Sequence, residues 1–171
     1  FTAAGVFTNV GGSVSNATVS ATTTTVANQI GATTGDILIG GAGNDTLTAG
    51  NLSQLTGGTG NDTFVMNVPT NVNSYSTITD LSAGDVIQLT AGTSFVSAAV
   101  TLANTAVFQD YANAAVNYLA GDTVNKDNAW FQFGGNTYIV ANDSQTDAVN
   151  TNFENGRDGI IKITGLVDLS T

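Results

Sequence analysis

The sequence predicts an all-β fold, in which a short parallel β-roll is continued by a β-rich C-terminal unit with one α-helix. Three observations support this. First, Thr, Val, Ala, Gly and Asn dominate the 171 residues, and Lys and Arg together number only three, a composition that favours strands and turns. Second, a glycine-rich nonapeptide occurs twice. Third, helical periodicity is found in one stretch of the C-terminal half.

The repeated nonapeptide has the form GGxGxDxUx, in which U is apolar. It occurs as GGAGNDTLT at 40–48 and as GGTGNDTFV at 57–65. Residues 31–39 keep Asp36 in the same register, and 49–56 form a degenerate unit. Each unit is a turn followed by a short strand, and the apolar U residue points inward. Because two units complete one coil, the strong units are expected to stack on the same edge.

The stacked turns would present only oxygen atoms to a ligand. Glycine permits positive φ, so the turns can direct their backbone carbonyls toward one point. Together with the carboxylates of Asp45 and Asp62, these carbonyls would form a flexible site with about six or more oxygen ligands. Calcium prefers such a site, whereas magnesium demands a stricter octahedron and retains its waters.

These nonapeptides resemble the repeats of the RTX (repeats-in-toxin) family. The resemblance implies a calcium-binding parallel β-roll. In such rolls the second and fourth residues of one turn and its aspartate face the first and third residues and the aspartate of the turn two units on. Carried over to this chain, one calcium ion lies between two ligand sets: Gly41, Gly43 and Asp45, and Gly57, Thr59 and Asp62. Gly58 and Gly60 complete the set of candidate backbone ligands. Because 31–39 lacks most glycines, Asp36 is either a ligand of a weaker calcium site or a solvated side chain.

The stretch STITDLSAGDVIQLT, residues 76–90, predicts strands on either side of a turn at 82–84. It resembles the segment that follows the roll in serralysin-type C-terminal domains, where such aspartates bind a last calcium. Continuing the count from 57 puts Asp80 at the sixth position of a unit beginning at 75. Asp80 and Asp85 are therefore either calcium ligands or side chains that cap the turn.

The helix is predicted over 104–120, with Asn104 or Thr105 as its N-cap and Gly121 at its end. Its apolar stripe, which includes Phe108 and Tyr111, predicts core packing. A hairpin is predicted over 130–140, where Trp130 to Val140 flank a Gly-Gly-Asn turn.

Another strand pair is predicted over 155–170, after an acidic loop. Four carboxylates fall in this region: Asp143, Asp147, Glu154 and Asp158. They either bind calcium or, as the favoured interpretation, form a solvated loop that pairs with Arg157 and Lys162.

The chain thus divides into a strand segment at 1–30, a calcium-binding roll at 31–66, and a capping region at 67–171, to which the resemblance described next adds a secretion signal. With a net charge of −10, it lacks the clustered Lys and Arg that nucleic-acid binding needs. No apolar run is long enough to span a membrane. The sequence contains no His and no Cys and no Walker motif, so we predict that it is not an enzyme.

Residues 76–171 resemble the C-terminal region of bacterial surface-layer (S-layer) proteins that are exported by type I secretion. The resemblance implies a C-terminal export signal read by an ABC transporter, secretion without an N-terminal signal peptide, a place at the extracellular cell surface, and self-assembly into a lattice. The predicted function is a non-catalytic structural module that folds on extracellular calcium. The alternatives are the C-terminal domain of a serralysin-type metalloprotease and the end of a large RTX adhesin.

Overall fold

A computed structural model describes residues 18–20, 29–31, 34–67, 74–89, 95–120, 128–142 and 152–170. Most of the predicted strand segment at 1–30 lies outside these residues, as do Asp143 and Asp147. The described part is mostly β with a single helix, which agrees with the predicted all-β class. The chain forms two compact units, Phe1–Asn67 with Ser76–Thr90, and Val68–Tyr75 with Ala91–Thr171. The segment boundaries drawn from the sequence stay a prediction.

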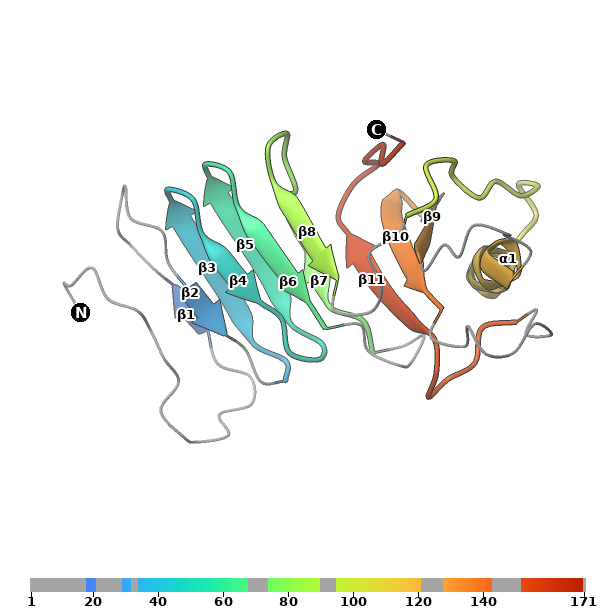
Figure 1. Ribbon diagram of the computed structural model, residues 1–171, viewed down its shortest axis with the longest axis horizontal. Coiled ribbons are helices and arrows are strands. Elements are labelled where there is room, and N and C mark those ends of the chain that lie inside the picture. The colour runs from blue at the N-terminus through green and yellow to red at the C-terminus, as the bar shows by residue number, and fades with distance from the viewer. Residues whose placement is uncertain are drawn as a thin grey trace. The chain divides into compact units, whose positions relative to one another are not determined.

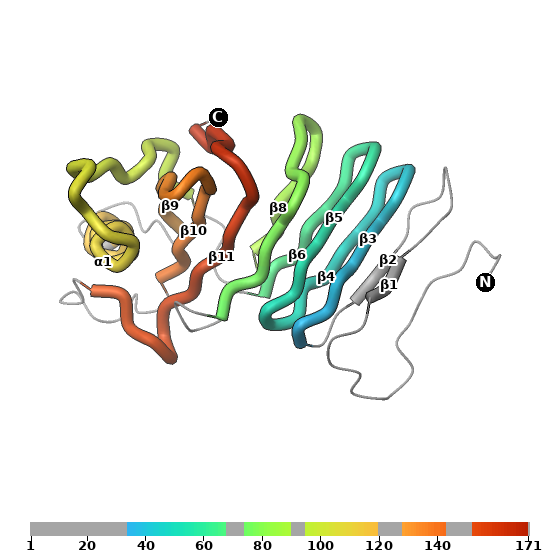
Figure 2. Tube along the Cα trace, turned by 180° about the vertical axis from the view of Figure 1, so that it is seen from behind, coloured from blue at the N-terminus to red at the C-terminus, as the bar shows by residue number. Residues whose placement is uncertain are grey.

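The first unit consists of strands that alternate along the chain between two parallel sheets (Figure 1). One sheet contains β1 (Thr18–Ser20), β3 (Ile37–Ala42), β5 (Gln54–Thr59) and β7 (Thr77–Ile78). The other contains β2 (Gln29–Gly31), β4 (Thr46–Thr48), β6 (Thr63–Met66) and β8 (Val86–Leu89). Figure 2 shows the chain passing back and forth, so that one pass through each sheet completes a coil.

The apolar U positions stack in register inside this unit. Leu38 pairs with Leu55, and Leu55 pairs with Ile78; all three are fully buried. In the other sheet, Leu47 pairs with Phe64, and both are also fully buried. The neighbours of these residues along each strand are more exposed, because successive side chains of a strand point to opposite faces. The interior of the first unit is therefore a narrow double row of aliphatic and aromatic side chains.

The second unit contains an antiparallel sheet and the helix. The strands β9 (Asn128–Phe133), β10 (Asn136–Ala141) and β11 (Gly159–Ile163) pair in the order β9-β10-β11. The predicted hairpin is confirmed, since β9 and β10 flank Gly134 and Gly135, whose φ values are 56° and 80°. The segment 155–170, predicted as a strand pair, contains only one described strand. After β11 the chain leaves the sheet at Gly165 (φ 90°), and the Val167 N–H donates to the Thr137 hydroxyl instead of a neighbouring strand.

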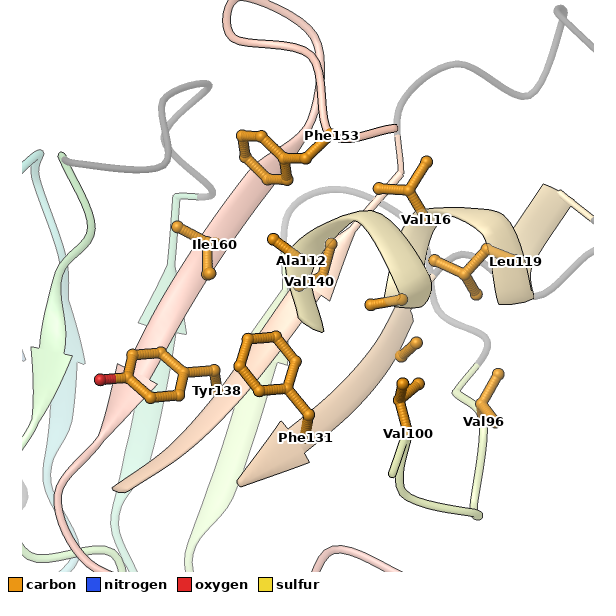
Figure 3. Close-up of a cluster of buried hydrophobic side chains, with 12 residues drawn as sticks. Val96, Val100, Ala112, Val116, Leu119, Phe131, Tyr138, Val140, Phe153 and Ile160 are labelled. Carbon is orange, nitrogen blue, oxygen red and sulfur yellow. The ribbon is translucent and has the colours of Figure 1, made fainter. Parts of the chain in front are cut away.

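The helix α1 (Phe108–Ala120) begins later than its predicted start at 104. The Asp110 carboxylate accepts the backbone N–H of Val107 at 2.9 Å, which makes Val107 the residue at the N-cap position. Asn104 and Thr105 lie in a turn before it. The predicted packing role of the aromatic residues is confirmed: Tyr111 stacks on Phe131, and Phe108 contacts Phe131 edge-on. Figure 3 shows α1 covering the sheet over the buried cluster, which includes Ala112, Val116, Val140 and Ile160. Among the described residues, no helix is long and apolar enough to cross a membrane.

The stacked apolar row predicts a large stability difference between two substitutions in adjacent, paired strands. Phe64→Ala should lower the free energy of unfolding by about 3–5 kcal/mol, because it opens a cavity at a fully buried position. Val86, which is 54% exposed, provides the control: Val86→Ala should change the stability by about 0.5 kcal/mol or less. Urea unfolding in calcium-containing buffer measures both. Equal losses would contradict the assignment of Phe64 to the interior.

Candidate metal centre

Three six-residue turns lie at the same end of the first unit, at 40–45, 57–62 and 80–85 (Figure 2). The strands that follow them pair in register, Thr46 with Thr63 and Thr63 with Val86. The sixth residues of the turns are therefore Asp45, Asp62 and Asp85. The count that placed Asp80 at a sixth position is wrong. The coil separation is 17 residues from Asp45 to Asp62 but 23 from Asp62 to Asp85, and the extra residues fall between β6 and β7.

Glycine is required in these turns because the backbones approach closely. Gly41, Gly43, Gly58 and Gly60 have φ values of 105°, 109°, 100° and 134°. A Cβ atom on Gly58 would collide with the carbonyl oxygen of Gly41, and one on Gly60 would collide with that of Gly43. The predicted ligand residues of the first turn thus present their carbonyl oxygens toward the second turn. The carbonyl of Thr59 accepts the N–H of Gly43 at 2.8 Å, which links the two turns directly.

The three aspartates at the sixth positions form a hydrogen-bonded column. The N–H of Asp45 donates to Oδ1 of Asp62, and the N–H of Asp62 donates to Oδ1 of Asp85, each at 2.8 Å. Asp45 and Asp62 are each only 1% exposed. The structure therefore brings together the two aspartates that the repeats single out, and it adds Asp85 next to them.

The surroundings of the Asp62 carboxylate favour a bound cation. Its Oδ2 atom is buried and has no hydrogen-bond partner in the described part of the chain. This atom lies against Gly57, where any Cβ atom would collide with it. Burial raises the pKa of the Asp62 carboxyl above its usual 3.8, and the nearby charges of Asp85, Asp45 and Asp80 raise it further, against a lowering by the hydrogen bond from Asp45. A buried carboxylate among like charges is stabilised by a bound cation.

The residues present fit a hard cation with oxygen ligands. Carboxylate and carbonyl oxygens are the donors that calcium prefers. No group of three His, Cys, Asp or Glu side chains gathers as a ligand cluster within the described residues. An ion at these turns would therefore depend on backbone carbonyls as much as on the aspartates, which is the division of ligands that the glycine pattern predicts.

The third turn differs from the first two. Both carboxylate oxygens of Asp80 accept backbone N–H groups at 2.9 Å, from Gly57 and from Gly58. The Oδ2 atom of Asp85 accepts the N–H and the hydroxyl of Ser82, at 2.7 and 3.0 Å. Asp85 thus makes the turn-capping contacts that were one of the two sequence interpretations, whereas Asp80 accepts its hydrogen bonds from the turn of the preceding coil. Calcium binding by Asp80 and Asp85 stays a prediction.

The remaining acidic candidates lie elsewhere. Asp36 is 5% exposed and precedes β3, at the opposite end of the coils from Asp45. In the second unit, Arg157 pairs with Glu154 at 3.4 Å, as expected. The interpretation of a solvated acidic loop is wrong for Asp158, which is fully buried and whose Oδ2 accepts the N–H of Glu154 at 2.7 Å.

Stacked parallel coils joined by glycine-aspartate turns define a repeat region of the calcium-binding class. The family model described as "Peptidase M10 serralysin C terminal" matches residues 2–153, and the chain belongs to this family. Its domain is the RTX-type calcium-binding region of secreted proteins. A comparison with the curated proteins gives no match.

Substitutions of Gly58 and Gly156 allow the stability cost of a positive φ to be measured apart from the stability cost of a steric clash. Gly58 and Gly156 have similar φ values, 100° and 95°, but a Cβ on Gly156 would meet nothing within 4 Å. Gly156→Ala should lower the free energy of unfolding by about 1–2 kcal/mol, the cost of positive φ alone. Gly58→Ala should cost clearly more, because the methyl group meets the Gly41 carbonyl. Denaturant unfolding of both variants gives the comparison. Equal costs would show that the turns are not tightly stacked.

The raised pKa of Asp62 predicts the pH dependence of the calcium-free protein. An acid whose pKa is higher in the folded state binds more protons there, so its contribution is present below pH 3.8 and is lost as the pH rises through the folded value. In a chelating buffer, the first unit should therefore gain stability as the pH falls from about 7 toward 4. Asp62→Asn, which resembles the protonated side chain, should weaken this dependence. Thermal melts at several pH values measure it, and an unchanged slope in the variant would contradict the assignment.

Proposed function

We propose that this chain is a non-catalytic domain whose first unit folds around calcium bound at the turns 40–45 and 57–62. The observation that carries this proposal is the buried Oδ2 atom of Asp62, which has no hydrogen-bond donor in the described part and lies in a turn lined by glycine. The residues that would hold the ion are those the repeat pattern names: Gly41, Gly43, Asp45, Gly57, Thr59 and Asp62. Gly58 and Gly60 would serve a further ion shared with the turn at 80–85.

Bound calcium would neutralise charge that the chain cannot neutralise itself. The net charge is −10, and the column of Asp45, Asp62 and Asp85 places carboxylates next to one another. Only three basic residues oppose them in the whole sequence. Because the binding free energy of a metal adds to the folding free energy, the first unit is expected to fold where calcium is abundant. Extracellular calcium modules bind at about 10⁻⁴–10⁻³ M, which suits folding after export.

The family match favours one of the alternatives for the parent protein. It supports a serralysin-type C-terminal domain, so a secreted metalloprotease is the parent that we propose. An HExxH zinc motif in a domain before this chain would establish it. The surface-layer reading, with lattice self-assembly, rests only on the composition and on the C-terminal resemblance. The adhesin reading would require tandem extender domains. In each case, type I export through an ABC transporter is part of the proposal.

A calcium titration tests the proposed function. The chain should gain β-structure cooperatively near millimolar calcium, as followed by far-UV circular dichroism. Asp62→Asn should weaken calcium binding by at least about 10- to 100-fold, since even outer-shell changes at metal sites cost that much. Asp168→Asn is the matched control, because this aspartate is exposed in the second unit and should leave the titration unchanged.

Two results would overturn the proposal. One is a calcium-free protein that is already fully folded at neutral pH. The other is an Asp62→Asn variant that titrates like Asp168→Asn. Light scattering in the same titration separates the parents: growth of large assemblies would favour the surface-layer reading, and a folded monomer would favour the protease or adhesin domain.

A further inference from the structure

The end of the coils opposite the glycine-aspartate turns has a side-chain column of its own. Ile37 pairs with Gln54, and Gln54 pairs with Thr77. The residues just before these strands are Asp36, Ser53 and Ser76, so serine replaces aspartate at two of the three positions. Ser53 and Ser76 are 1% and 0% exposed. This column is the counterpart of Asp45, Asp62 and Asp85.

The serines make the same contact along the column as the aspartates. The N–H of Ser53 donates to Oγ of Ser76 at 3.1 Å, just as the N–H of Asp45 donates to Oδ1 of Asp62 at 2.8 Å. At both ends, therefore, a side-chain oxygen of one coil accepts a backbone N–H of the coil before it.

The hydroxyl oxygen of serine and the carboxylate oxygen of aspartate differ in the hydrogen bonds that they can make. An ionised carboxylate only accepts hydrogen bonds, whereas a hydroxyl also donates one. The Ser76 hydroxyl donates to the carbonyl of Gly50 at 2.7 Å, so this buried hydroxyl both accepts and donates a hydrogen bond. The Oδ2 atom of Asp62 finds no donor in the described part. The buried Oδ2 atom of Asp62 thus favours a positive charge beside it, whereas the hydroxyls of Ser53 and Ser76 carry no charge; the one acidic residue of their column is Asp36, in the first coil.

The backbone carbonyls of the turn at 49–51 also accept hydrogen bonds from the protein. The Nδ2 of Asn67 donates to the carbonyl of Ala49 at 3.0 Å, and the N–H of Gly35 donates to that of Asn51 at 2.7 Å. With the Ser76–Gly50 contact, three successive carbonyls, at 49, 50 and 51, accept hydrogen bonds from the chain itself. A calcium ion at this end would have to share three successive carbonyls with protein donors, as an ion at the opposite end would share the Thr59 carbonyl with the Gly43 N–H.

We propose that the serine end, comprising residues 49–53, Asn67 and Ser76, is closed by the protein's own donors and takes no calcium, so that the ion binds at one end of the coils only. The proposal rests on the proposed function for the opposite end. Ser76 is then a positioning residue, which holds adjacent coils in register without an ion. The strands would enter the calcium-binding turns already aligned from their other end.

Calcium counting at saturation tests the inference on the full chain. Equilibrium dialysis should give the same number of ions for the unsubstituted protein, Ser76→Ala and Asp36→Asn, and fewer ions for Asp45→Asn combined with Asp62→Asn. Urea unfolding in saturating calcium should show that Ser76→Ala lowers the folding equilibrium constant about tenfold or more, because the Gly50 carbonyl and the Ser53 N–H lose their partner. Asn67→Ala, which removes one donor from an exposed side chain, provides a milder variant if Ser76→Ala does not fold.

The outcomes separate the two proposals. Fewer bound ions in Asp36→Asn, Ser76→Ala or Asn67→Ala would overturn the ion-free serine end while leaving calcium binding in place. An unsubstituted protein that binds no calcium would overturn the proposed function. In that case the stability of Ser76→Ala decides the inference, since an unchanged folding constant would show that the hydroxyl does not hold the coils.

Discussion

The buried carboxylates of Asp45 and Asp62, in the turns 40–45 and 57–62, are the constraint on which the first unit depends. Asp62 accepts the N–H of Asp45 through one oxygen and keeps its second oxygen buried in its own turn. The hydrogen bond fixes the register of neighbouring coils, but burial next to other carboxylates is unfavourable. The same side chain therefore aligns the coils and opposes their formation. A bound cation, as we propose for these turns, would resolve this conflict, because it would neutralise the charge without disturbing the hydrogen bonds between coils.

The narrow interior explains why this conflict matters for the whole unit. Each coil contributes one or two buried residues per strand, such as Leu38 in β3 or Phe64 and Met66 in β6, and the residues between them are more exposed. The hydrophobic gain grows with the apolar area that is buried, at about 25 cal/mol per Å². A stack with so few apolar residues per coil gains little compared with a wide core. The uncompensated buried charge of Asp62 is thus large on the scale of the stability that its coil adds.

The repeats made the glycine-aspartate turns predictable, because each fixed position has a physical role that only certain residue types can fill. Gly58 and Gly60 are needed for positive φ and close approach, and Asp62 for its carboxylate. The sequence could not predict which later residue completes the column. A constant count chose Asp80, whereas the coil lengthens in the loop after β6, and only the pairing of β6 with β8 identifies Asp85. Ser53 and Ser76 escaped notice for a related reason: serine is common in turns, and its role becomes apparent only from the strand register.

The second unit is stabilised in a different way. Its helix packs on the β9-β10-β11 sheet through aliphatic residues and a set of aromatic contacts around Phe131. The carboxylates described here make ordinary contacts: Glu154 pairs with Arg157 at the surface, and the buried Asp158 accepts a backbone N–H within its own turn. Hydrophobic burial of this kind does not depend on an ion. The two units therefore combine a conventional core with a stack whose stability we propose to follow the calcium concentration, and under this proposal only the first unit would respond to the ion.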